Sequence, residues 1–101
     1  MTTLERLAQW YQSNCDGDWE HGNGIKIDTL DNPGWRVHID VRDTPLGEQP
    51  FDAFESQYSH DRDWLRCWKE DRTFKIACGP ARLEDGLKVF LDWTDKSAQA
   101  G

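Results

Sequence analysis

Residues 16–41 read DGDWEHGNGIKIDTLDNPGWRVHIDV, and the rest of the chain is organised around this segment. Apolar and polar residues alternate on both sides of Asp31-Asn32-Pro33-Gly34, and a period of two is typical of half-buried strands. Pro33 presets φ at the first central position of a turn, and Gly34 is expected to supply the positive φ that a type II turn needs next. The sequence therefore predicts a β-hairpin over residues 24–42.

Length and charge limit what the chain can be. Its 101 residues suffice for one domain with a single modest core, to which six Trp and four Phe add bulk. The formal net charge of −7 disfavours direct binding to nucleic acid, which needs clustered Lys and Arg. The same charge favours a basic protein partner, because complementary fields speed association.

Signals for export or membrane insertion are missing from the sequence. The N-terminus, MTTLERLAQWYQ, has neither a basic segment nor an apolar one, and no apolar run reaches transmembrane length. Cys15, Cys67 and Cys78 are odd in number and scattered, unlike the cysteines of a secreted disulfide framework. We expect a cytoplasmic protein with reduced thiols that does not engage a membrane.

Helices are expected near both ends of the chain. Thr2 and Glu5 fit a capping box, and apolar residues at helical spacing predict an amphipathic helix over 3–14. A second helix is expected to open at Gly79-Pro80, because proline is acceptable in a first helical turn. Its buried stripe should consist of Leu83, Leu87, Phe90 and Leu91. Residues 1–95 are expected to form a single domain, and residues 96–101 a flexible tail.

Further strands are expected between the two helices, over 64–68 and 73–78. If Leu65 and Cys67 face the core, the alternation places Trp64, Arg66 and Trp68 together on the opposite face.

The remaining segments are less regular. Residues 51–58 fit either a helical turn or a short edge strand, and their aromatic content favours the strand. Residues 60–63 are expected to form a turn. Consecutive strands with short connections predict an α+β fold, namely an antiparallel β-meander of four or five strands with the N-terminal and C-terminal helices packed on one face.

Residues suited to binding a protein occur in the acidic loop and on the outward faces of two strands. Trp and Arg are enriched in interface hot spots, although a Trp can equally complete a small core. Trp35 is expected to lie inside with Val37 and Ile39. The predicted partner-binding residues are Asp16, Asp18, Trp19, Glu20, His21, Arg36, His38, Asp40, Trp64, Arg66 and Trp68.

Thiol chemistry at Cys78 and Arg82 is an alternative. A cysteine just before a helix N-terminus can have a lowered pKa, and Arg82 could bind an anion, as a small thiol-dependent transferase would require. However, Pro80 removes one N–H from any anion cradle. Cys78 is also in phase with Phe74 and Ile76, so a buried structural role is favoured.

A metal site and a carboxylate pair are weaker alternatives. The candidate ligands Cys15, Asp16, Glu20 and His21, with His38 or His60 as a further ligand, match none of the common zinc spacings. Asp18 and Glu20, with His21, could act as acid and base, but 19 acidic residues make chance proximity common. No catalytic residue, metal or cofactor is therefore predicted.

The run Asn14-Cys15-Asp16-Gly17-Asp18-Trp19-Glu20-His21, continued by Gly24-Ile25-Lys26-Ile27 and TLDNPGW, resembles the immunity protein 53 family of bacterial polymorphic toxin systems. The similarity extends through the strand at Trp64 to the final helix, and so covers nearly the whole chain. The resemblance implies a cytoplasmic, non-enzymatic antitoxin that binds and neutralises a cognate protein toxin.

By analogy the expected toxin is a nuclease, whose basic active site an acidic protein would occlude. A generic adaptor with several unrelated partners remains the alternative binding function.

Overall fold

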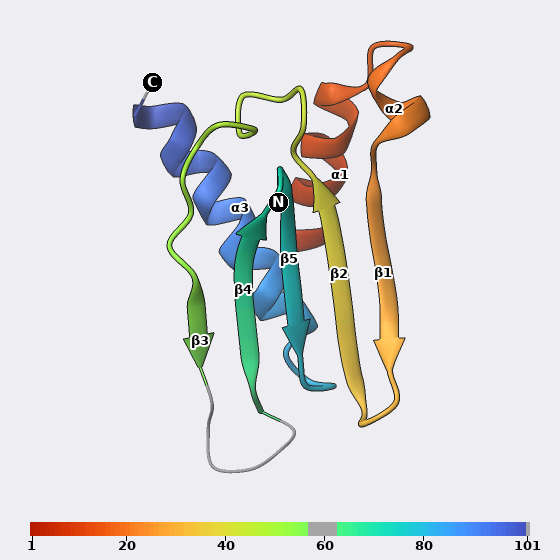
Figure 1. Ribbon diagram of the computed structural model, residues 1–101, viewed down its shortest axis with the longest axis vertical. Helices are drawn as coiled ribbons and strands as arrows, with labels where there is room; N and C mark the ends of the chain where they lie inside the picture. Colours follow the sequence, from red (N-terminus) through yellow and green to blue (C-terminus); the bar gives the residue numbers. More distant parts are fainter. Residues whose placement is uncertain (57–62, 101) are drawn as a thin grey trace.

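The computed structural model describes residues 1–56 and 63–100, which form an α+β fold (Figure 1). Neighbouring strands are all antiparallel, and their order in the sheet is β1-β2-β5-β4-β3. The elements are α1 (Thr3–Asn14), α2 (Trp19–Gly22), β1 (Ile25–Leu30), β2 (Gly34–Asp40), β3 (Phe54–Ser56), β4 (Leu65–Glu70), β5 (Thr73–Cys78) and α3 (Leu83–Ala100). The predicted fold class is confirmed.

Both long helices lie on the same side of the sheet, where α1 contacts α3 and α3 contacts β4 and β5 (Figure 1). The core fills the space between these two layers. Its fully buried side chains include Val37, Ile39, Phe74 and Ile76 from the sheet and Phe90 from α3. Among the residues that the structure describes, no helix covers the other side of the sheet, which we call the outer face.

The capping box at the N-terminus forms as the sequence predicts. The Thr2 hydroxyl accepts a hydrogen bond from the Glu5 backbone N–H (3.1 Å), and the Glu5 carboxylate accepts one from the Thr2 N–H (3.0 Å). These bonds satisfy two donors that the first helical turn leaves without partners. Helix α1 accordingly has the predicted bounds.

One connection departs from a simple meander. β3, β4 and β5 follow one another across the sheet, but β2 pairs with β5, so the chain crosses from β2 to the far edge strand β3. The pairing sets Val37 opposite Ile76 and Ile39 opposite Phe74, which joins two apolar faces into one core. Trp35 lies on the same side, half-buried against the core as predicted.

The type II turn expected at Gly34 is wrong. Gly34 does not have a positive φ and is instead the first residue of β2. A Cβ atom at this position would collide with the carbonyl oxygen of Cys78 in β5. The glycine is therefore needed because two backbones approach closely, and not for left-handed backbone geometry.

Helix α3 differs from the prediction at both ends. It begins at Leu83, since the chain first makes a turn in which the Arg82 N–H donates to the Gly79 carbonyl (3.1 Å). It continues to Ala100, so residues 96–100, expected as a tail, are helical. Within the helix, Gly86 lies against β5, where an added Cβ would be 2.6 Å from Cγ2 of Ile76.

The ambiguous segment 51–58 contains a strand, as the sequence favours, although only over Phe54–Ser56. Residues 57–58 and most of the expected turn at 60–63 lie outside the described residues. Across the described parts of the chain, no helix is both long and apolar enough to cross a bilayer.

Candidate protein-binding surface

Cross-strand pairing arranges the side chains of the outer face in two rows that run across the strands. The first row consists of Lys26, His38, Lys75 and Trp68. The second consists of Asp28, Arg36, Ala77, Arg66 and Glu55. Residues from all five strands thus meet on a single surface, which no local stretch of sequence could assemble.

Arg66 and Trp68 lie together on the outer face of β4. The Arg66 guanidinium carbon lies 5.3 Å from the ring centroid of Trp68, a cation–π distance. The guanidinium also lies 3.8 Å from the Glu55 carboxylate. The predicted strand phase is confirmed, because Leu65 and Cys67 are each 1% exposed on the opposite face.

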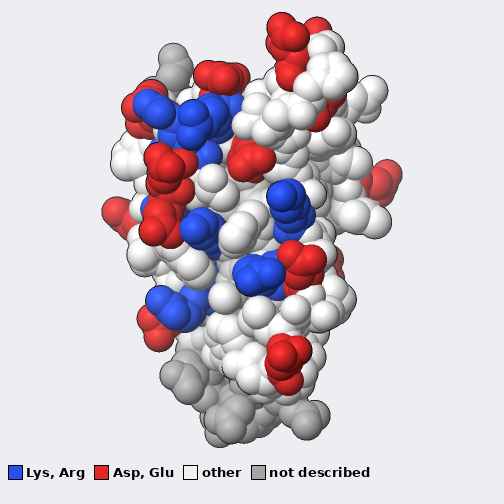
Figure 2. Space-filling view, turned by 45° about the vertical axis from the view of Figure 1, so that its right-hand side comes forward, with Lys and Arg blue, Asp and Glu red and all other residues white. Residues whose placement is uncertain are grey.

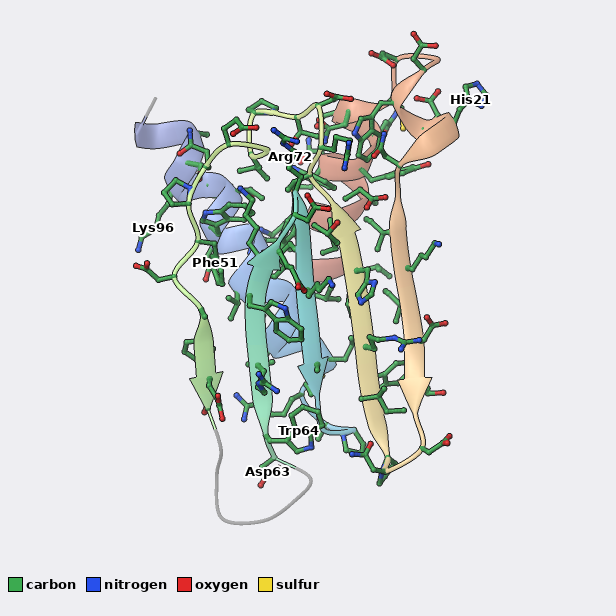
Figure 3. The ribbon with its side chains drawn as sticks, viewed as in Figure 1. His21, Phe51, Asp63, Trp64, Arg72 and Lys96 are labelled. Carbon is green, nitrogen blue, oxygen red and sulfur yellow. The ribbon has the colours of Figure 1, made fainter. Side chains whose placement is uncertain are left out.

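Trp64 precedes β4 and is half-buried at the lower end of the strand in Figure 3, next to Asp63. Its carbonyl oxygen accepts a hydrogen bond from the Gly79 N–H (2.9 Å). The residue thus borders the outer face near its lower end.

His38 lies half-buried on β2 within the first row. Burial lowers the pKa of its imidazole, and the positive charges of Lys75 and Arg36 lower it further, against the opposing effect of Asp28 and Asp40. His38 is therefore neutral at pH 7, where one ring nitrogen can donate a hydrogen bond while the other accepts one.

Charges of both signs mix on the outer face. Figure 2 shows blue and red side chains side by side across the visible surface. Lys75 Nζ lies 2.8 Å from the Glu70 carboxylate, which lowers the pKa of Glu70. Arg36 lies 3.5 Å from Asp28. The net negative charge of the chain is thus not concentrated on this surface, and exposed pairs of this kind add little stability.

The acidic loop before β1 is held by its own carboxylates. Asp16 Oδ1 accepts from the N–H groups of Trp19 and Asp18, both at 2.9 Å, and these bonds lower the pKa of Asp16. Backbone N–H groups, its own first and then those of Asp16 and Gly17, lower the pKa of Glu20. Both carboxylates stay ionised at neutral pH and fix the loop conformation.

The loop adjoins one end of the outer face. The Gly24 N–H donates to the Asp40 carboxylate (2.9 Å), and the Asp40 N–H donates to the Gly24 carbonyl (3.0 Å). Asp18 and His21 are exposed, and His21 points away from the molecule in Figure 3.

Trp19 is not an exposed contact residue, and that prediction is wrong. Its side chain is 6% exposed, and Nε1 donates to the Arg42 carbonyl oxygen (2.8 Å). Its ring lies edge-on to Trp10 at a centroid distance of 6.0 Å and tilted against Tyr11 at 5.9 Å. Trp19 therefore connects the loop to α1 and belongs to the scaffold.

Comparison with family models gives the decisive observation, because the model described as Immunity protein 53 matches residues 4–95. The chain belongs to the immunity protein 53 family. Membership implies that it neutralises a cognate toxin, and immunity proteins of this kind are typically non-enzymatic binders. Comparison with curated proteins found no match, and comparison with solved structures found none.

The thiol alternative does not fit this immunity protein. Cys78 is fully buried, and burial raises the pKa of its thiol to about 11. The guanidinium of Arg82 is also buried and donates to the Asp85 carboxylate (2.7 Å) and the Asp63 carbonyl oxygen (2.6 Å). A neutral, inaccessible thiol cannot act as the nucleophile of a transferase.

A metal site is not supported by the geometry either. Within residues 1–56 and 63–100, no three His, Cys, Asp or Glu side chains lie where they could hold a metal ion together. His60, a further candidate ligand, lies outside the described residues.

The predicted site residues of this immunity protein therefore divide into groups. Those that the sheet brings together on the outer face are Arg36, His38, Arg66 and Trp68, with Asp40 and Trp64 near its ends. Those at the loop are Asp16, Asp18, Glu20 and His21. Lys26 and Lys75 were not among the predicted residues. The alternation of the sequence indicates that both point outward, but only the strand register places them in the first row.

Proposed function

We propose that this immunity protein neutralises its toxin by binding it through the outer face and so occluding the toxin's active site. The observation that carries the proposal is the first row of side chains, which ends at Trp68 beneath the Arg66 guanidinium. The family supplies the cognate toxin as partner. The surface and the occlusion are our inference.

Two residue types on the β4 part of this surface, Trp and Arg, suit a protein interface. Trp and Arg are the side chains most enriched in binding hot spots. Arg66 is held between Trp68 and Glu55, so it loses less conformational freedom when a partner covers it. Surrounding pairs such as Arg36 with Asp28 would set orientation and partner choice rather than supply most of the affinity.

The toxin is proposed to be a basic nuclease. The chain carries a formal charge of −7, and Asp16 and Glu20 have lowered pKa values at the loop that adjoins the outer face. Fixed, ionised carboxylates can imitate phosphate groups at a site built to hold nucleic acid. This arrangement predicts that association with the toxin slows as salt concentration rises.

Co-expression with the toxin encoded in the neighbouring gene tests the proposal. The immunity protein should restore growth, and Lys26→Ala with Arg66→Ala should reduce protection because both residues lie on the outer face. Lys88→Ala with Lys96→Ala is the matched control, since it removes the same charge from exposed positions on α3. Full protection by the folded outer-face variant would contradict the proposed surface.

A pull-down from the native cell separates a dedicated toxin partner from adaptor function. Recovery of the toxin supports the proposal. Recovery of several unrelated proteins without a toxin would favour the adaptor.

A further inference from the structure

Strand β1 forms one edge of the sheet and has a neighbour, β2, on one side (Figure 1). The two strands pair continuously from Ile25 opposite Ile39 to Leu30 opposite Gly34, without a bulge. β1 also contains no proline. Two devices that prevent an edge strand from pairing with another chain, bulges and prolines, are thus missing from β1, and its charged side chains, Lys26 and Asp28, are of opposite sign.

The hydrogen bond from the Asp40 N–H to the Gly24 carbonyl fixes the phase of this ladder. In an antiparallel pair, the backbone groups of alternate residues point toward the neighbouring strand. Those of Lys26 and Asp28 therefore point to β2. Those of residues 25, 27 and 29 point to the free edge.

Apolar side chains gather on the helix side of this edge. Ile27 is 41% exposed and Leu4 of α1 is 71% exposed, and both are among the most exposed large hydrophobic residues described. Between α1 and β1 lies a groove of about 380 Å³ lined by Leu4, Leu7, Ala8, Tyr11, Gly24 and Ile25.

We propose that β1 pairs with β1 of a second copy of this chain, antiparallel about a twofold axis at Ile27. Ile27 then meets Ile27 of the second copy through their free backbone groups. On the outer face, Lys26 lies opposite Asp28 of the second copy, and Asp28 lies opposite its Lys26. The five-stranded sheets of the two copies then form one continuous sheet, and the outer faces of both copies remain uncovered.

The charges of β1 favour both a second copy of this chain as the partner and one particular pairing register. A shift that centres the pair on position 26 sets two Lys26 side chains against each other, and one centred on position 28 sets two Asp28 side chains against each other. Like charges directly opposite on neighbouring strands are destabilising, whereas opposite charges attract. The order Lys26-Ile27-Asp28 is thus complementary to itself in the single register that also buries Ile27 against its copy.

Sedimentation equilibrium of the purified protein, without toxin, tests the dimer over a wide range of concentration. We expect the mass to rise to twice 11.8 kDa as concentration increases, at physiological salt where the screening length is about 8 Å. A wild-type protein that stays monomeric throughout overturns the proposal.

Charge variants test the register. Lys26→Asp and Asp28→Lys should each raise the dimer dissociation constant by about tenfold, because two attractive pairs become repulsive. An equimolar mixture of the two variants should associate again, since each variant carries the charges that the other lacks. Lys88→Asp, on an exposed position of α3, is the control and should dimerise like wild type.

Restored association in the mixture cannot arise from unfolded chains, so it separates pairing from a loss of fold. Unchanged dimerisation of both single variants, or a mixture that does not associate, overturns the proposed pairing.

Discussion

Replacing Trp19 with Ala should remove a large part of the folding free energy. The ring is 6% exposed, packs on Trp10 and Tyr11, and donates to the Arg42 carbonyl. Truncating a buried Trp costs about 3–5 kcal/mol, out of a total of about 5–15 kcal/mol for a typical domain. We therefore expect a loss of about 4 kcal/mol, which lowers the melting temperature by about 20 °C in a domain of this size.

Urea unfolding followed by far-ultraviolet circular dichroism measures this loss without depending on Trp fluorescence. Trp19→Phe should cost only about 1–2 kcal/mol, because it keeps most of the ring contacts and loses the hydrogen bond. Trp68→Ala is the matched control, since it removes the same side chain from the outer face, where Trp68 is half-buried. If Trp19→Ala were as stable as wild type but no longer bound the toxin, Trp19 would be a contact residue of the interface and not part of the scaffold.

Three further predictions concern the core and the outer face. Gly86→Ala gains about 1 kcal/mol of helix propensity, but the new Cβ lies 2.6 Å from Ile76 Cγ2 and overpacking costs about 1–3 kcal/mol. Urea unfolding should therefore show a free energy of unfolding about 1 kcal/mol lower than that of wild type, and a stabilised variant would contradict the close packing of Gly86 on Ile76. Cys67 and Cys78, with pKa values raised to about 12 and about 11, should resist iodoacetamide at neutral pH until the protein unfolds; rapid labelling in mass spectra of the native protein would be inconsistent with their burial. The folded protein lowers the pKa of His38 from 6.5, so on acidification the unfolded chain takes up a proton on this residue before the folded chain does, and the free energy of unfolding falls as pH drops below about 6.5. His38→Gln should make the free energy of unfolding less dependent on pH, and parallel curves for variant and wild type would exclude this role of His38.

Elements whose signals lie within a few residues could be predicted from sequence. The capping box at Thr2 and Glu5 fixed the start of α1, and the period of two placed both strands of the first hairpin. The inward phase of Leu65 and Cys67 followed in the same way, because alternation alone decides which face of a strand is apolar.

Features that depend on distant partners could not be predicted. The need for glycine at position 34 arises from the Cys78 carbonyl on another strand. Trp19 looked like an exposed loop residue because its hydrogen-bond acceptor, the Arg42 carbonyl, lies 23 residues away. The pairing of β2 with β5 likewise joins segments far apart in sequence, and local pattern carries no information on that register.

The candidate surface likewise combines features that could be predicted from local sequence with features that depend on distant partners. Alternation placed Arg36, His38, Arg66 and Trp68 outward, and the structure brings them onto one face. Lys75 could be recognised as a member of the first row only after β5 was known to lie between β2 and β4.

The most direct test of the proposed toxin-binding surface is the dissociation constant of the toxin complex, measured by isothermal titration calorimetry for Trp68→Ala. We expect a loss of about 2 kcal/mol in binding free energy, or about thirtyfold in affinity, as for a hot-spot residue. Phe54→Ala is the control, since Phe54 is an aromatic residue 42% exposed on the helix side of the sheet edge, and it should bind like wild type. Wild-type affinity for Trp68→Ala, or an equal loss for Phe54→Ala, would contradict binding through the outer face.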